Sequence, residues 1–322
     1  MDARARDVQG MAASKGRVRG VDVVGVGANS VDFVYRLPAW PRPVSPFAKL
    51  PITEHLISCG GQATTALAAC AAMGLRTSYV GTLGADEHAT RMRDELCRRG
   101  IDISHAIARD AGNPFAVILL DDREGERVVL WKRDPRVALM PAEIDRESIA
   151  SARLLHVDDV DLDASIEAAR IAREAGMPAT SDIERTGEDV RTLVDAVSVP
   201  ILAEHVPAAL TGETDMRRAL ERLRRPHHQM LCVTLGARGA AMLTGGEFIA
   251  EQGIPVKTVD TTGAGDVFRG AFIYALLRGD EPREILRFAN AAAAVSCTRV
   301  GAMSSVPTLE EVGLQAGGER RA

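Results

Sequence analysis

Short β-branched runs alternate with helical stretches along most of this chain, and this rhythm leaves few folds open to it. The run VDVVGVGAN at 21–29 indicates a buried strand that ends in a glycine turn. From Leu154 onward the rhythm continues as RLLHVDD, DASIEAARIAREAG and MPATSDI, which indicate a strand, a helix and a strand. Strands that alternate with helices predict an α/β fold with a mainly parallel sheet covered by helices on both faces.

Two β-rich stretches, 32–52 and 112–136, interrupt this rhythm. The first is proline-rich and irregular, at the place where a crossover helix is expected to follow the first strand. The second contains FAVILLDDREGERVVLW at 115–131, in which two β-branched runs flank DDREGE, a pattern typical of a hairpin. We expect the two stretches to meet as one small sheet, a β lid that projects from the main domain.

The domain boundaries and the cellular setting follow from the same patterns and from composition. We expect a disordered tail at 1–19, an α/β domain at 20–31, 53–111 and 137–312, the β lid at 32–52 and 112–136, and a frayed tail at 313–322. The net charge of −5 gives no reason to expect a nucleic-acid partner. Five cysteines without CxxC spacing indicate reduced thiols and a cytoplasmic protein. No apolar run approaches the roughly 18 residues of a membrane helix.

The stretch TVDTTGAGDVFRGAF, from Thr258 to Phe272, joins a glycine turn to a carboxylate at the start of an apolar helix. A helix start exposes unpaired N–H groups, and glycines before it let the backbone approach an anion closely. Gly263, Ala264 and Gly265 are therefore suited to bind a charged oxygen. Phosphoryl transfer needs such donors together with a base for the attacking hydroxyl, a role that suits Asp266. The alternative is that Asp266 only caps the helix.

The whole string DTTGAGDVFRGAF resembles the C-terminal signature of the ribokinase-like (pfkB-type) carbohydrate kinase family. The resemblance covers roughly residues 20–312, because SCGGQATTALAACAAMG, VTLGARGA and NAAAAVSCTRVGAMSSVP are similar to other segments of that family. It implies a ribokinase-like three-layer sandwich with a β-sheet lid, and the activity of an ATP-dependent sugar kinase. VDTTGAGDVFRGA followed by CTRVGA is similar to ketohexose and sulfofructose kinases.

The resemblance also implies roles for residues around the sugar. Asp266 corresponds to the base that deprotonates the sugar hydroxyl, and Gly263, Ala264 and Gly265 correspond to the anion hole for the γ-phosphate. Asp32 corresponds to an acid that accepts hydrogen bonds from sugar hydroxyls. The implied substrate-binding set is Asn29, Asp32, Gly60, Gly61, Gln62 and Thr65. Thr65 stands where many members have an asparagine, which weakens any expectation of ribose specificity.

The nucleotide and cation sites are implied in the same way. Thr234, Gly236, Gly239 and Asn290 correspond to residues near ATP. Where ribokinases carry an Asn-x-x-Glu motif for Mg²⁺, this chain has Ala203 and Val206, and Glu204 is the acid that remains. The implied ligands of a monovalent cation, K⁺ in this prediction, are Asp260, Thr262, Ser296, Arg299, Gly301 and Ser305.

The identity of the substrate stays open at this level, and three hypotheses remain. The first is a kinase for a neutral ketohexose or a similar sugar. The second is a kinase for a phosphorylated or sulfonated sugar, bound by cationic lid residues such as Arg127, with Lys132, Arg133 and Arg136 close in sequence. The third is a sugar- or nucleotide-binding regulator without catalysis. Exposed lid strands further suggest a homodimer formed through the lid.

Overall fold

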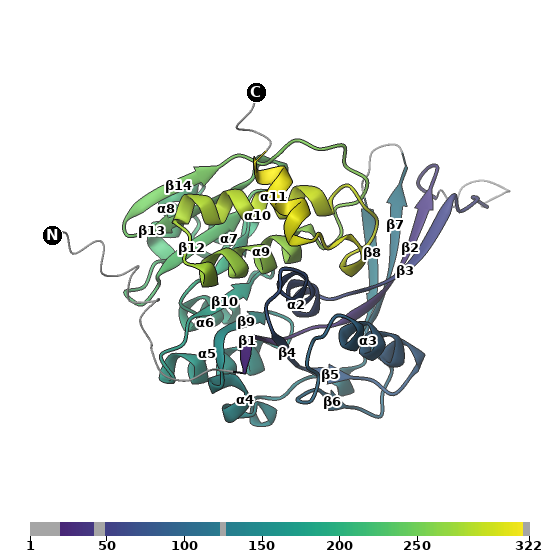
Figure 1. Cartoon of the computed structure of the whole chain (residues 1–322), viewed down its shortest axis with the longest axis horizontal. Helices are drawn as coiled ribbons and strands as arrows, with labels where there is room; N and C mark the ends of the chain where they lie inside the picture. Colours follow the sequence, from purple (N-terminus) through teal and green to yellow (C-terminus); the bar gives the residue numbers. More distant parts are fainter. Residues whose placement is uncertain (1–19, 42–48, 123–126, 318–322) are drawn as a thin grey trace.

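The computed structural model describes residues 20–41, 49–122 and 127–317. The predicted tail at 1–19 lies outside these residues, as do 42–48 and 123–126 of the lid and 318–322 at the C-terminus. Figure 1 shows an α/β body from which a narrow group of strands projects to one side. No helix in the described ranges is both long and apolar enough to cross a bilayer.

The body is built around a mainly parallel sheet. Its strands are β1 (Val21–Val26), β4 (Thr77–Val80), β9 (Ala152–Asp158), β10 (Ala179–Asp182), β11 (Ile201–Ala203), β12 (Met230–Thr234), β13 (Ala240–Thr244) and β14 (Glu247–Glu251). Strands β4, β1, β9 and β10 pair in parallel, and isolated bridges from Thr180 and Ile183 carry the sheet on to β11 and β12. The last two strands, β13 and β14, are antiparallel.

Helices cover both faces of this sheet, so the expected three-layer sandwich is confirmed. One face is covered by α2 (Gln62–Ala72), α3 (Glu87–Arg98), α9 (Ala264–Arg278), α10 (Pro282–Ser296) and α11 (Leu309–Gly317). The other is covered by α4 (Arg146–Ala150), α5 (Leu162–Glu174), α6 (Glu188–Ala196), α7 (His205–Thr211) and α8 (Met216–Leu223). Neighbouring residues of one strand enter opposite cores: Leu154 packs in the first and Leu155 in the second, since successive side chains of a strand alternate.

The lid is a four-stranded sheet in the order β3-β2-β7-β8. It comprises β2 (Ser30–Leu37), β3 (Glu54–Gly60), β7 (Phe115–Asp121) and β8 (Arg127–Lys132). The predicted hairpin is present as the antiparallel pair of β7 and β8. The lid sheet is larger than the sequence indicated. Residues 54–60 and the start of β2 were expected in the α/β domain, but Ser30 pairs with Gly60, so both segments belong to the lid sheet.

The C-terminus also differs from expectation. The segment 313–317, predicted to be frayed, continues helix α11, whose Val312 is fully buried in the core beneath α10. The remaining elements are short: β5 (Thr82–Leu83) pairs with β6 (Ile107–Ala108), and 3-10 turns occur at η1 (Pro135–Val137), η2 (Pro141–Glu143), η3 (Gly236–Arg238) and η4 (Met303–Ser305).

Candidate active site

The glycine turn of GAGD forms the start of helix α9. Gly263 is the N-cap residue, and its φ of 75° lies in the left-handed region that glycine tolerates. A Cβ at Gly263 would lie 2.8 Å from Cα of Ala302, so the turn also packs closely on the C-terminal loop. Asp266 follows in the first helical turn and is buried. The positive end of the helix dipole therefore coincides with the proposed anion hole and base.

Charged neighbours surround the carboxyl group of Asp266. Burial raises its pKa well above the usual range, and the negative charges of Asp182 and Glu184 raise it further. Arg269 acts in the opposite direction and lowers the pKa of Asp266. Arg269 itself forms an ion pair with Asp182, with 2.7 Å between Nη2 and Oδ1. The sequence analysis identified Asp266 but missed this buried pair beside it.

A cavity of about 560 Å³ lies beside the start of α9. Ala264 and Gly265, which were expected in an anion hole, line it. It is also lined by four of the residues expected near a nucleotide: Thr234, Gly236, Gly239 and Asn290. Asn290 donates hydrogen bonds to the carbonyl oxygens of Glu251 and Gln252, and thereby holds one wall of the cavity in place.

Other parts of this cavity were not expected. Its wall includes residues 253–256, to which the sequence had given no role. In the sequence, these residues form an irregular, proline-containing run shortly before the GAGD turn. Glu204 is not among the described lining residues of the cavity and instead forms an ion pair with Arg238. Its carboxylate is thus engaged at the surface in this structure.

Asp32 lies at the root of the lid, where strand β2 leaves the body. It is buried, and its Oδ1 accepts a hydrogen bond from the Ser30 hydroxyl at 2.8 Å. A Cβ at Gly60 would lie 2.1 Å from Asp32 Oδ2, so the carboxylate occupies the space that the glycine leaves free. Burial raises the pKa of Asp32 to about 6, with a smaller contribution from the charge of Asp260. These contacts bring Asp32 and Gly60 together at the root of the lid.

Asn29 lies next to Asp32 but is engaged within the protein. Its Nδ2 donates to Tyr79 Oη and to the carbonyl oxygen of Thr82, while its Oδ1 accepts a hydrogen bond from Asn113. A Cβ on Gly61 would lie only 2.4 Å from Cα of Asn29. The side chain of Asn29 therefore links the loop after β1 to Tyr79, Thr82 and Asn113, a structural role that the sequence did not reveal.

The start of helix α2 is held by an acid that the sequence analysis also missed. Asp158, at the end of β9, accepts hydrogen bonds from the backbone N–H groups of Ala28 and Ala63. The signal in the sequence was the pair of acids in HVDDVD at the end of a buried strand. Of the two pocket residues predicted on α2, Gln62 is half-buried, whereas Thr65 is fully buried and its hydroxyl has no hydrogen-bond partner among the described residues.

The four cationic residues of the lid region have different surroundings. Arg133 forms an ion pair with Asp161, and Arg136 forms one with Asp134. Arg127 reaches out of the lid, donates a hydrogen bond to Thr261 Oγ1, and lines the 560 Å³ cavity. Lys132 instead lines a smaller cavity of about 110 Å³. That cavity is bounded by Gly27, Ala28, Asn29, Ser30, Thr82, Pro114, Phe115, Trp131, Lys132 and Arg133.

The residues expected around a monovalent cation are partly brought together. Asp260 is buried; its Oδ1 accepts hydrogen bonds from the N–H and hydroxyl groups of Thr262, and its Oδ2 accepts one from the N–H of Gly301. The hydroxyl groups of Ser296 and Ser305 donate to nearby backbone carbonyls, and the side chain of Arg299 pairs with Glu311. Asp260 thus ties the glycine turn to the C-terminal loop, and backbone carbonyls there are the kind of ligand that fits a hard cation.

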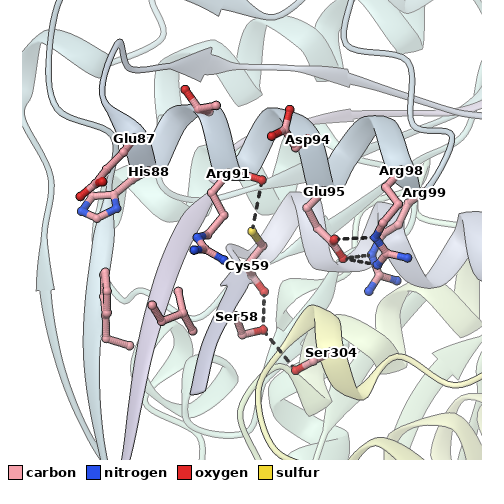
Figure 2. A pocket seen from close by; sticks show the side chains of 13 residues that line it. Ser58, Cys59, Glu87, His88, Arg91, Asp94, Glu95, Arg98, Arg99 and Ser304 are labelled. Atoms are coloured by element: carbon pink, nitrogen blue, oxygen red, sulfur yellow. Dashed lines mark hydrogen bonds and ion pairs between the residues drawn. The ribbon is translucent and has the colours of Figure 1, made fainter. Parts of the chain in front are cut away.

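Another cavity, of about 860 Å³, lies elsewhere, between α3 and the lid (Figure 2). Its described lining residues do not overlap with those of the 560 Å³ cavity. Glu95 pairs with Arg98 and Arg99 along its edge, and the hydroxyl groups of Ser58 and Ser304 lie 3.2 Å apart. Its charges are of both signs, and it lacks a glycine turn at a helix start. The chemistry expected of a phosphate site is therefore found beside α9.

Comparison with known proteins places this arrangement among sugar kinases. Residues 54–309 match the family described as pfkB family carbohydrate kinase. Fructokinase-2 of Solanum habrochaites is 30% identical over 318 residues, which cover 90% of this chain and 94% of that protein. A putative ribokinase from Agrobacterium tumefaciens is 28% identical with a TM-score of 0.86, covering 94% and 99% of the two chains. A fructokinase from Xylella fastidiosa with bound ATP superposes with a TM-score of 0.79 at 21% identity, covering 93% and 99%.

Proposed function

Because the chain belongs to the pfkB family of carbohydrate kinases, we propose that it transfers the γ-phosphoryl group of ATP to a hydroxyl of a ketohexose. The observation that carries this proposal is the buried carboxyl group of Asp266 at a glycine turn that opens onto the 560 Å³ cavity. The fructokinase relative from Solanum habrochaites supports the choice of a ketohexose. The chain's fold is shared with a fructokinase that holds ATP, which supports the nucleotide.

The proposed reaction assigns one task to each part of the site. Asp266 takes the proton from the sugar hydroxyl, whose oxygen then attacks the γ-phosphorus. The bond from that phosphorus to the bridging oxygen breaks, and ADP leaves with the electron pair. The backbone N–H groups at Gly263–Gly265 stabilise the negative charge on the transferred phosphoryl oxygens. Asp32 holds the sugar by accepting hydrogen bonds from its hydroxyl groups.

Two ions accompany this proposal. Mg²⁺ enters with ATP and neutralises charge on the phosphates when bound. We also propose that K⁺ binds to backbone oxygens of the loop that Asp260 ties to the glycine turn, and that it stabilises the turn. Activity titrated with KCl against choline chloride at constant ionic strength tests this. Equal rates in both salts would contradict it.

The direct test is ADP release with MgATP across a panel of ribose, fructose, tagatose, fructose phosphates, sulfofructose and nucleosides. In the variant Asp266→Asn we expect turnover to fall by about 10²-fold or more, since a positioned base contributes on that scale. Sugar binding, followed by calorimetry, should be largely kept. Near-normal turnover in this variant would remove Asp266 as the base. ATP binding without turnover on any sugar would favour a non-catalytic regulator.

A second candidate substrate is an anionic ketose, and the position of Lys132 supports it. Lys132 lines the small cavity beside Asn29 and makes no ion pair with any described residue. Phosphate or sulfonate is the group that such a cation binds. Turnover of fructose phosphates or sulfofructose without turnover of fructose would favour this candidate. The reverse result would favour the neutral ketohexose.

We further propose that two copies of the chain associate through their lids. Strand β8 is the edge of the lid sheet, all six of its residues are exposed, and the exposed fraction of Trp131 is 75%. A long apolar edge strand presents unpaired backbone groups that another copy of the same strand can satisfy. Light scattering at assay concentration tests the dimer, and Leu130→Lys should shift it toward monomer. A wild-type monomer would contradict the proposal.

A further inference from the structure

Arg269 is a charged side chain enclosed in the core beneath the glycine turn. It lies on α9, its exposed fraction is 1%, and it is among the largest fully buried side chains of the chain. Removing a guanidinium group from water costs free energy unless its charge is compensated. A compensating carboxylate is present, because Asp182 on β10 is also fully buried and lies 2.7 Å from Nη2 of Arg269.

The position of Arg269 relates it directly to the proposed catalytic turn. It follows Asp266 by three residues on the same helix, so the two side chains share a face of α9. A Cβ built on Gly265 would lie 2.6 Å from Nη1 of Arg269. The guanidinium group thus occupies the volume that a side chain at Gly265 would fill. Arg269 thus lies beside Gly265 while forming an ion pair with Asp182.

The other charged and titratable groups near Asp266 come from several elements. Asp182 lies on β10 and Glu184 directly after it, and both raise the pKa of Asp266. From β9, His156 and Asp158 interact with Arg269 and Asp182, and from β12 Cys232 interacts with Arg269. Helix α2, described over its full length, carries no charged side chain, and the charged residues of α10 pair with Glu251 or with each other. Arg269 is therefore the cation that faces this group of acids.

We propose that Arg269 is the positioning residue of the base: it divides its positive charge between Asp182 and Asp266, and so keeps Asp266 ionised in a buried site. Two buried carboxyl groups near each other disfavour each other's ionisation, and the negative charge of Asp182 raises the pKa of Asp266. Without a cation, Asp266 would hold a proton at neutral pH and would not accept one from the sugar. This inference rests on the proposed role of Asp266 as the base.

The first test is the pH dependence of kcat/KM, which reports the ionisation of the essential base in the free enzyme. Loss of a neighbouring cation raises the pKa of a carboxyl group, so Arg269→Gln should move the acid limb to higher pH. An opposite charge at close range shifts such a pKa by about one unit or more, so the acid limb should move by about that much and the activity lost on it should recover in alkaline buffer. Arg269→Lys keeps the charge and should keep the acid limb near its wild-type position.

The second test changes the other partner of the ion pair. Asp182→Asn removes a negative charge next to Asp266 and leaves the charge of Arg269 to Asp266 alone, so the acid limb should move to lower pH. Shifts of the acid limb in opposite directions for Arg269→Gln and Asp182→Asn support the inference. Shifts in the same direction, or reduced rates without any shift of the acid limb, overturn it. If Arg269→Gln does not fold, the double variant Arg269→Gln/Asp182→Asn replaces it: an acid limb at higher pH than in Asp182→Asn supports the inference, and an equal acid limb overturns it.

These outcomes separate the inference from the proposed function. An active Asp266→Asn variant would remove the base itself and with it the role of Arg269. An inactive Asp266→Asn variant, combined with unshifted profiles for the other two variants, would remove only the role of Arg269. Thermal unfolding of each variant, measured in the same buffers, separates a loss of folded protein from a change in ionisation.

Discussion

The start of α9 and the lid strand β8 meet where Arg127 contacts Thr261, yet the two regions are built in opposite ways. At the start of α9, Asp266, Arg269 and the adjoining Asp182 are buried among one another, and glycines leave space for their side chains. Along β8 every residue is exposed. A substitution in the first region disturbs several buried partners at once, whereas a substitution in β8 changes one exposed side chain. We therefore expect substitutions in the first region to have larger effects than substitutions in β8.

The largest effect is expected from a glycine at the start of α2, beside Asn29. A Cβ in Gly61→Ala would meet Cα of Asn29 at 2.4 Å, and the φ of +98° is unfavourable for alanine. Overpacking costs about 1–3 kcal/mol and should add to the cost of the backbone conformation. Gly74→Ala is the matched control, since its φ is +91° with no atom within 4 Å of the added Cβ. Urea unfolding should show a clearly larger loss for Gly61→Ala, and equal losses would contradict the close contact.

A smaller and more selective effect is expected for the lid residue that reaches furthest toward α9. Arg127→Met removes a cation that lines the 560 Å³ cavity proposed to bind the nucleotide, so kcat should fall about tenfold, the scale of one hydrogen bond to a charged group. The KM for the sugar should change little. Arg136→Met is a matched control, because Arg136 pairs with Asp134 near the lid. A rise in the sugar KM with kcat unchanged would instead place Arg127 on the substrate, as the sequence alone suggested.

The smallest effect on a neutral sugar is expected for the other exposed lid cation. Lys132→Met should change kcat/KM for fructose by about twofold or less, the scale of an exposed charge. For a fructose phosphate or sulfofructose the same variant should lose activity much more strongly if Lys132 binds the anionic group. The ratio of the two losses, measured with the same enzyme preparation, decides between a neutral and an anionic substrate.

The contrast between the two regions also explains what the sequence could predict. The α/β class followed from strand and helix periodicity, and the β7–β8 hairpin followed from its turn residues, because both signals are local. The sequence did not reveal β3, since HLISCGG mixes polar and apolar residues and pairs with β2 across an intervening loop. The glycine turn and Asp266 were visible as one contiguous string.

The parts of the site that were missed depend on contacts between distant segments. Arg269 looks like an ordinary polar residue within an apolar helix, and only the fold brings Asp182 to it. Asn29 was expected to bind sugar because it neighbours Asp32, but its amide is used by Tyr79, Thr82 and Asn113. Sequence motifs therefore indicated segments that line the 560 Å³ cavity and the root of the lid, but the direction of individual side chains required the packing.

Strand β2 begins and strand β3 ends at the root of the lid, and we expect this to couple release of the product to the motion of the lid. Asp32 stands on β2, and Gly60, against which its carboxylate packs, ends β3. If these strands tilt away, the carboxylate proposed to hold the sugar tilts with them. Opening of the lid would then also release the phosphorylated sugar from this carboxylate. In such an enzyme product release, rather than phosphoryl transfer, limits the rate of turnover when the transfer step is fast.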